Sequence, residues 1–334
     1  MRLEDVCIKG TSNIRQKDVN ESGRYPVYGA AGPVGFMNSF QYDEPYVGVV
    51  KDGAGIGRAT YLPSNSSIIG TIQALIPKNN VLPKYLYYAV SSMHLEKYYS
   101  GATIPHIYFK NYKHERFVLV SKKEQEQIIW RFSLLEKMIS NKQQQLLKLN
   151  ELIKARFVEM FGDPVNNSKD QPVDKFINIV KLQRGFDLPV KKRDSTGKIP
   201  VFGSNGIVGY HTEAKAKNGI ITGRSGTIGK VYRKSGEYWP LNTSLFSVDT
   251  HGNNIIFLQV LMQLFHLERF YNGAGVPTLN RNDVHRQKII KISLDKQNEF
   301  ANFVQQVDKS KVAVQKSLDE TQKLYDSLMQ EYFG

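Results

Sequence analysis

The sequence predicts an α+β protein of two tandem globular domains, each made of short β-strands and followed by a long helix. We expect the two helices to pair as an antiparallel coiled coil with pseudo-two-fold symmetry. Three observations support this prediction: two long helical stretches with heptad periodicity, an internal repeat, and short β-like runs separated by turn residues.

The first helical stretch covers residues 124 to 161 and contains neither glycine nor proline. Its apolar residues alternate in steps of four and three, which is the pattern of a coiled-coil seam. The seam residues are Ile128, Phe132, Leu135, Ile139, Leu146, Leu149, Ile153 and Met160, with Lys142 and Arg156 at the two remaining positions. At about 1.5 Å per residue this helix would be roughly 55 Å long, so it needs a partner helix to cover its seam.

The second stretch covers residues 296 to 333 and has the same periodicity. Its seam residues are Phe300, Val304, Val307, Val314, Leu318, Tyr325, Leu328 and Tyr332, with Lys311 and Thr321 as the exceptions. The polar exceptions occupy different seam positions in the two helices, so they favour one register of pairing at some cost in stability. The alternative is two independent amphipathic helices, each packed on its own core.

Comparison of the chain with itself indicates a tandem duplication. The matching pairs are HLEKYYSGATIP (94–105) with HLERFYNGAGVP (266–277), GRYPVYGAAGPVGF (23–36) with GKIPVFGSNGIVGY (197–210), and VVKDGAGIGRATY (49–61) with IITGRSGTIGKVY (220–232). The last pair needs one gap to align its glycines. Each copy is therefore one globular unit followed by one long helix.

Each globular unit is rich in Gly, Pro, Tyr and Val, and its turn residues predict small strands rather than alternating strands and helices. The expected strands are 46–50, 68–76, 219–221 and 245–248, with a closing strand at 117–120 in the first copy and at 289–292 in the second. The expected shorter helical segments are 84–99 and 255–270. The expected segments are a domain at 1–120, a helix at 121–162, a linker and second domain at 163–292, and a helix at 293–334.

The composition favours a soluble protein with a polyanionic partner. The 334 residues carry a formal net charge of +14, and the excess is not confined to one tail. Charged residues interrupt the start and no apolar run reaches the roughly 18 residues of a membrane span, so we expect a cytoplasmic protein with no membrane partner. The single cysteine, Cys7, excludes an internal disulfide and is expected to be a small, half-buried strand residue.

The order of domain, helix, domain, helix resembles the specificity subunit of a Type I restriction-modification system. The resemblance also rests on an E-Q-x-x-I-like element at each helix start, formed by Glu124, Gln125 and Ile128 and, more weakly, by Lys296, Gln297 and Phe300. The phrase ARFVEMFGDP at 155 to 164 is similar to these subunits as well. The resemblance covers the full length of the chain.

This resemblance implies a DNA-recognition protein without catalytic chemistry, in which 1–120 and 163–292 are target-recognition domains. Its implied partners are double-stranded DNA, two methylation subunits and restriction subunits. The implied cofactors, S-adenosylmethionine, ATP and magnesium, belong to those subunits and none to this chain. Two similar but non-identical units on antiparallel helices would read an asymmetric, bipartite target with an unread spacer.

Candidate DNA contacts come from turns and segments that differ between the two copies while their flanks agree. The segments after Pro105 and Pro277 combine a basic residue with Asn, which supply donors and acceptors for base edges. The candidates are Lys51, Arg58, Lys110, Asn111, Lys191, Lys192, Arg193, Asn205, Arg224, Lys230, Asn280 and Arg281. The alternative for each is a solvated basic turn or a polar strand edge.

Catalytic motifs are incomplete. The glycines of GAGIG at 53–57 and GRSGTIG at 223–229 lack P-loop spacing, so tight turns are expected. DEPY at 43–46 lacks the first proline of the adenine-methyltransferase motif, and the histidines form no HExxH. The repeated His94 and His266 are expected to share a packing role. Two alternatives stay open, a DNA adenine methyltransferase with an unconventional catalytic part and a coiled-coil scaffold that binds only proteins.

Overall fold

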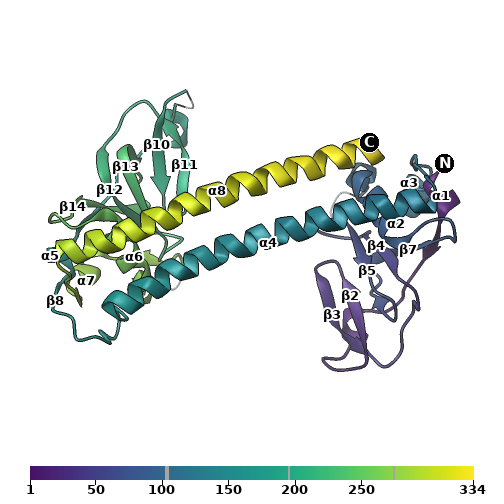
Figure 1. The fold of residues 1–334 in the computed structure, drawn as a ribbon, viewed down its shortest axis with the longest axis horizontal. Coiled ribbons are helices and arrows are strands. Elements are labelled where there is room, and N and C mark those ends of the chain that lie inside the picture. The colour runs from purple at the N-terminus through teal and green to yellow at the C-terminus, as the bar shows by residue number, and fades with distance from the viewer. Residues whose placement is uncertain (102–104, 195, 274) are drawn as a thin grey trace. The chain divides into compact units, whose positions relative to one another are not determined.

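The computed structural model describes residues 1–101, 105–194, 196–273 and 275–334. The chain forms two compact units (Figure 1). Unit 1 comprises Met1–Gln143 and Lys316–Gly334, and unit 2 comprises Gln144–Gln315. Each long helix therefore contributes one part to each unit. The predicted domain limits, which treat each helix as a separate segment, stay a prediction.

Unit 1 contains two small sheets in its described residues. Its strands are β1 (Cys7–Gly10), β2 (Tyr25–Gly29), β3 (Gly32–Met37), β4 (Tyr46–Val50), β5 (Ala59–Leu62), β6 (Ser67–Ile68) and β7 (Ile72–Pro77), and its short helices are α1 (Leu3–Val6), α2 (Pro83–Ser92) and α3 (Phe109–Tyr112). One sheet is antiparallel with the order β1-β7-β4-β5, and the other has the order β3-β2-β6 with β2 and β6 parallel. Helix α2 packs against β4, β5 and β7 (Figure 1).

Unit 2 repeats this plan with a larger sheet. Its strands are β8 (Val173–Lys175), β9 (Lys181–Arg184), β10 (Ile199–Gly203), β11 (Gly206–His211), β12 (Ala216–Gly223), β13 (Val231–Pro240), β14 (Ser244–Asp249), β15 (Tyr271–Asn272), β16 (Thr278–Leu279) and β17 (Lys288–Ile290), and its short helices are α5 (Phe176–Ile179), α6 (Ile255–Leu264) and α7 (Arg281–His285). The main sheet has the order β11-β10-β13-β12-β14-β9. Strand β13 pairs with both β12 and β10, and so joins two groups of strands that unit 1 keeps in separate sheets.

The long helices are α4 (Lys122–Phe161) and α8 (Leu294–Phe333). Helix α4 begins with a capping box, in which the Ser121 backbone N–H donates to Glu124 Oε2 at 2.9 Å and the Glu124 N–H donates to Ser121 Oγ at 3.3 Å. None of the described helices has both the length and the apolarity of a membrane span.

The contacts within each unit show that α4 and α8 run antiparallel. In unit 1 the ring centroids of Phe132 and Tyr325 are 5.1 Å apart, and about three turns further along α4 Lys142 Nζ donates to Ser317 Oγ at 2.8 Å. In unit 2 the Phe157 and Phe300 rings are 5.4 Å apart. The polar interruptions of the seam are therefore satisfied by local partners, as Lys142 illustrates.

Burial of the predicted seam residues is uneven along the helices. The buried seam residues are Ile128, Phe132, Leu135, Ile153, Phe300, Val304 and Val307. The half-buried ones are Ile139, Leu146, Leu149, Met160, Val314, Leu318, Tyr325, Leu328 and Tyr332. All of the buried seam residues except Leu135 belong to the hydrophobic core of one of the globular folds, because a two-helix seam alone covers only one side of each side chain.

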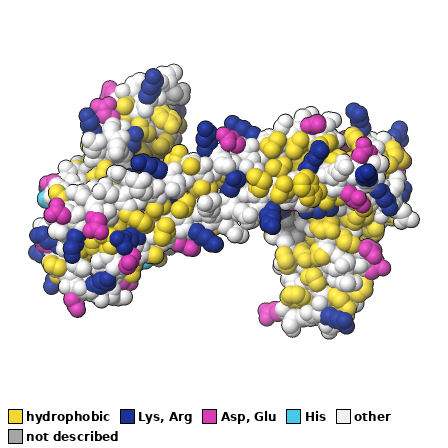
Figure 2. All heavy atoms as spheres, in the orientation of Figure 1, with side chains coloured by type: hydrophobic (Ala, Val, Ile, Leu, Met, Phe, Trp, Pro, Cys, Tyr) yellow, Lys and Arg dark blue, Asp and Glu magenta, His cyan; other side chains and the backbone are white. Residues whose placement is uncertain are grey.

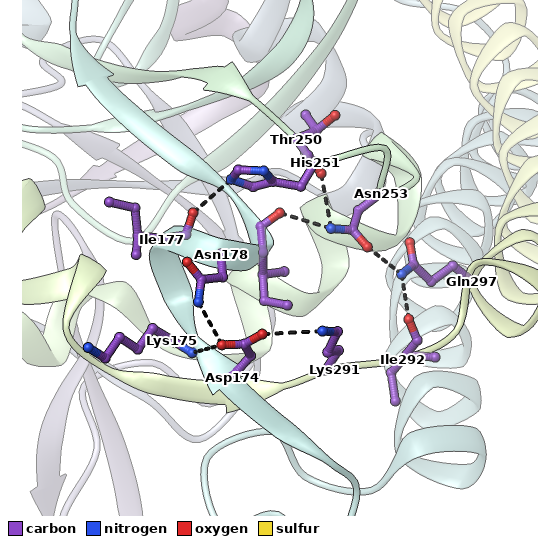
Figure 3. A network of polar contacts seen from close by, with 11 residues as sticks. Asp174, Lys175, Ile177, Asn178, Thr250, His251, Asn253, Lys291, Ile292 and Gln297 are labelled. Atoms are coloured by element: carbon purple, nitrogen blue, oxygen red, sulfur yellow. Dashed lines mark hydrogen bonds and ion pairs between the residues drawn. The ribbon is translucent and has the colours of Figure 1, made fainter.

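A buried glutamine near the start of each long helix binds that helix to its globular fold. Gln297 donates to Asn253 Oδ1 at 2.7 Å and to Ile292 O at 2.8 Å (Figure 3). It also accepts a hydrogen bond from Asn254 N at 2.9 Å. Gln125 makes the equivalent bonds in unit 1, accepting from Leu82 N and donating to two backbone carbonyls. This shared role gives a physical reason for the glutamine in the repeated helix-start element.

We expect Gln297→Leu to lower the free energy of unfolding of unit 2 by about 2 kcal/mol, because it leaves buried backbone groups without partners. Urea denaturation followed by circular dichroism measures the change. Gln305→Leu, at an exposed position of α8, is the matched control and should change stability by less than about 0.5 kcal/mol. Equal effects of the two substitutions would show that the buried bonds contribute nothing specific.

Two predicted strands differ from the structure. The expected strand at 68–76 is divided into β6 and β7 by a turn, in which Ile72 N donates to Ile69 O. The expected closing strand at 117–120 is wrong, since the described backbone there pairs only through Arg2 and Arg116. The chain turns into α1 at Leu3, which leaves too little extended backbone for a ladder. In unit 2, β8 supplies that partner to β17.

The expected helical segments 84–99 and 255–270 are each interrupted by a histidine. His94 and His266 have left-handed backbone conformations, with φ of 50° and 55°, and each is followed by a short 3₁₀ helix. Both side chains are exposed and contact the acid two residues on, Glu96 or Glu268. The repeated histidine therefore marks a repeated turn rather than the packing role that the sequence suggested.

Cys7 lies in β1 as expected but is fully buried rather than half-buried. Burial raises the pKa of its thiol to about 12, and Sγ donates to Leu3 O at 3.2 Å. The thiol is therefore protonated and unreactive at neutral pH.

Candidate nucleic-acid interface

The duplication places one basic residue at the same backbone position in each unit. Lys51 follows β4 and Arg224 follows β12. The Lys51 carbonyl accepts from Ile107 N at 2.9 Å, and the Arg224 carbonyl accepts from Leu279 N at 2.8 Å. Two further equivalent bonds join Gly53 N to Pro105 O and Gly226 N to Pro277 O, both at 3.0 Å. The glycine turn is thus bonded to the segment after the repeated proline in both units.

The glycine turns pack closely on the bend that follows α2 or α6. Gly57 and Gly229 have φ of +82° and +89°, which only glycine adopts readily. A Cβ on Gly57 would lie 2.4 Å from Glu96 N, and a Cβ on Gly229 would lie 2.4 Å from Glu268 Oε2. Both segments are tight turns between strands, as the sequence predicted.

In unit 2 a cleft brings together three of the predicted residues, Arg224, Asn280 and Arg281. The cleft has a volume of about 390 Å³ and is also lined by Arg184. Leu245 and Leu279, each 1% exposed, form an apolar floor. Three arginines around an apolar floor can contact both an anionic backbone and the edge of a planar base.

A chain of polar contacts lies beside Arg224. Arg224 Nη1 donates to Asn242 O at 3.2 Å, and Asn242 Nδ2 donates to Asp187 Oδ1. Asp187 also pairs with Arg184 Nη2 at 3.6 Å. Sequence reasoning did not select Arg184 or Asn242 as contacts, because neither belongs to a repeated motif and their proximity depends on the packing of β9 beside β14.

The basic cluster Lys191, Lys192 and Arg193 lies in and after the 3₁₀ turn Val190–Lys192. Lys191 and Lys192 are exposed, whereas Arg193 is half-buried and donates from Nη1 to Val208 O at 3.3 Å. Arg193 lines a second cleft of about 290 Å³ together with Asp187 and Asn242. The cleft of Arg193 and the cleft of Arg224 are therefore adjacent.

Lys230 and Asn205, also predicted contacts, come together in a different part of unit 2. Lys230 Nζ donates to Asn205 Oδ1 at 2.6 Å, which joins the turn after β10 to the turn after β12. Neither residue lines the cleft that contains Arg224. The structure thus divides the predicted residues of unit 2 among two adjoining clefts and a separate exposed pair, of which Lys230 lines a further cleft of about 710 Å³.

In unit 1 the predicted residues Lys51, Lys110 and Asn111 belong to the glycine turn and the segment that binds it. His106 Nδ1 lies 2.6 Å from Asp52 Oδ1, and Lys110 Nζ lies 5.6 Å from the centroid of the Tyr108 ring. Asn111 and Lys110 are exposed in α3. The fourth predicted residue, Arg58, donates to the Ala30 carbonyl and so bridges two turns.

The remaining surface offers no single basic patch on the face shown in Figure 2, where Lys and Arg side chains are interspersed with Asp and Glu. Within the described residues, no group of three or more His, Cys, Asp and Glu is placed to hold a metal ion. His285 is buried and accepts from Leu182 N at 2.9 Å, and burial lowers its pKa. It is a structural residue that fills the space beside Phe176.

Comparison with known proteins identifies the family. The family described as "Type I restriction modification DNA specificity domain" matches residues 1–151 and 175–322. No curated protein sequence matches the chain.

Two solved structures share the fold. The S subunit of a Type I restriction-modification system from M. genitalium is 18% identical with a TM-score of 0.66, and the match covers 100% of this chain and 95% of that chain. A structure described as "Structural basis underlying complex assembly and conformational transition of the type I R-M system" is 12% identical with a TM-score of 0.58, covering 100% of this chain and 96% of that one. The two family matches fall on the two halves of the duplication. The chain belongs to the Type I restriction-modification DNA specificity family, and it is a subunit that specifies DNA sequence.

Proposed function

We propose that this specificity subunit reads an asymmetric, bipartite target in double-stranded DNA, with one half-site for each unit. The observation that carries the proposal is the backbone frame shared by Lys51 and Arg224, by which we mean the hydrogen bonds that join each glycine turn to the segment after the repeated proline. The same backbone hydrogen bonds hold a different basic residue next to a different post-proline segment in the two units. Equivalent frames with different side chains would approach DNA alike and select different bases.

The residues around the two frames support different half-sites. Lys51 is accompanied by the Asp52–His106 pair and by Lys110 above Tyr108. Arg224 is accompanied by Asn280 and by two further arginines. A lysine is a point donor, whereas an arginine offers a planar fork, so the two sites favour different base edges.

We further propose that the chain is not itself an enzyme and that it acts in the cytoplasm with methylation and restriction subunits. S-adenosylmethionine, ATP and magnesium would be bound by those subunits. An exposed apolar stripe on α4 supports a protein partner: Trp130, Leu134 and Met138 lie at successive helical turns and are 66%, 45% and 39% exposed. Large apolar side chains in such a row favour protein contact over solvent.

Mapping of methylated adenines in host DNA, with and without this gene, tests the proposal. We expect one bipartite methylated sequence to disappear with the gene, with two dissimilar half-sites separated by a constant gap. A host methylation pattern that does not depend on the gene would contradict the proposal.

Two further measurements address the alternatives. Photocrosslinking of labelled S-adenosylmethionine to the isolated chain should stay at background, and labelling would instead indicate a methyltransferase. Nuclease footprinting with the methylation subunits should show sequence-dependent protection, and protection insensitive to sequence would favour the scaffold.

A further inference from the structure

The three arginines that line the cleft of Arg224 differ in how firmly the surrounding structure holds them. The Arg224 backbone is bonded on both sides, donating to Thr243 O at 2.9 Å and accepting from Leu279 N at 2.8 Å. Its guanidinium donates from Nη1 to Asn242 O at 3.2 Å, and the Asn242 side chain is in turn held by Asp187. Arg224 is therefore positioned before any ligand arrives, which is what selective contact with a base requires.

The bonds of Arg224 leave most of its donors available. A guanidinium carries five N–H donors, and the contact with Asn242 uses a nitrogen of only one of its three arms. Guanine presents two adjacent acceptors, O6 and N7, in the major groove, and a planar fork matches them both. Neither adenine, cytosine nor thymine presents two adjacent acceptors there.

Arg281 and Arg184 are placed differently. Arg281 is exposed at the first position of α7, at the rim of the cleft. The guanidinium of Arg184 is 3.6 Å from Asp187, so part of its charge is already compensated. An exposed and adaptable arginine suits a phosphate oxygen, which needs charge rather than exact orientation.

We propose that Arg224 reads a guanine in the half-site of unit 2, that the Asn242–Asp187 contacts orient its guanidinium, and that Arg281 binds the adjacent phosphate. The inference rests on the proposed function of the chain. It assigns base selection to one residue and backbone affinity to another within the same cleft. Lys51, in the equivalent frame of unit 1, cannot form the same planar fork of donors. We therefore expect a different base preference at the corresponding position of the other half-site.

The test uses the purified complex of this chain with its methylation subunits and a DNA library randomised at each half-site position. For the wild type we expect one half-site to require G·C at a defined position. Arg224→Gln should reduce discrimination at that position about tenfold or more and leave the other half-site unchanged. Arg224→Lys, which keeps the charge, should relax the same position.

Arg281→Gln should behave differently, weakening binding to all sequences alike and lowering the slope of log affinity against log salt by about 1. Lys51→Gln should alter only the other half-site, which assigns each half-site to its unit. Arg286→Gln is the matched control, because Arg286 lies just after α7, is exposed, and pairs with Asp283 outside the cleft. It should leave every preference unchanged.

Circular dichroism of each variant complex shows that the fold is kept. Uniform weakening by Arg224→Gln, or relaxation at an A·T position, would overturn the assignment while leaving the proposed function intact. A wild-type complex that selects no sequence would overturn both.

Discussion

Replacing Phe300 with alanine is expected to lower the free energy of unfolding of unit 2 by about 3–5 kcal/mol, the largest effect of any single substitution considered for this chain. Phe300 is fully buried on α8. Its ring lies 5.4 Å from Phe157, 5.7 Å from Phe161 and 6.4 Å from Phe257, measured between centroids. Removal of this ring leaves a cavity where α4, α6 and α8 meet, and the three remaining rings cannot close it.

Urea denaturation measures the loss, and hydrogen exchange followed by mass spectrometry locates it. Exchange should accelerate in α6 and in the parts of α4 and α8 that belong to unit 2. Val312→Ala, on the same helix at a side chain that is 70% exposed, serves as the control and should change stability little. A loss below about 1 kcal/mol for Phe300→Ala would mean that the four rings do not join the helices to the fold.

The helices could be predicted closely from the sequence because their signal is long and redundant. Many turns without glycine or proline, with apolar residues at heptad spacing, point to the same element, and the structure extends the predicted stretches by only two residues at their starts, to Lys122 and Leu294. The capping box at Ser121 and Glu124 is a further local signal for the start of α4.

The strands were harder to predict because their pairing depends on partners elsewhere in the chain. Residues 117–120 have the composition of a strand, but among the described residues the backbone they meet is only the short extended segment before α1. In the same way, the surroundings of Arg224 depend on Arg184 and Asn242, which are brought to it by the packing of the sheet rather than by their spacing in the sequence. The repeat predicts which segments lie at equivalent places in the two units, and the fold determines which side chains meet there.

Gly57→Ala is the second substitution with a large expected effect, and it should lower the free energy of unfolding of unit 1 by about 2–5 kcal/mol. Two causes add: the left-handed conformation at φ +82° costs an alanine about 1–2 kcal/mol, and its Cβ would lie 2.4 Å from the backbone nitrogen of Glu96. A backbone atom cannot rotate away, so the turn from Lys51 to Arg58 must move off the bend that follows α2. Because Lys51 belongs to that turn, recognition of one half-site should be lost together with stability.

Gly53→Ala separates the two causes. Gly53 has a similar φ of +85°, but open space surrounds the position of its missing Cβ, so only the conformational cost of about 1–2 kcal/mol applies. Gly229→Ala in unit 2 should fall between the two, since the atom it meets is the end of the flexible Glu268 side chain.

Thermal and urea denaturation rank the three variants, and selection from a randomised DNA library reports the half-site affected. If Gly57→Ala and Gly53→Ala were equally destabilising, close packing of the turn on Glu96 would not be what positions Lys51. We expect the loss of stability to be largest for Gly57→Ala, intermediate for Gly229→Ala and smallest for Gly53→Ala. That order would show that the turn needs glycine at position 57 because it packs against the backbone of Glu96.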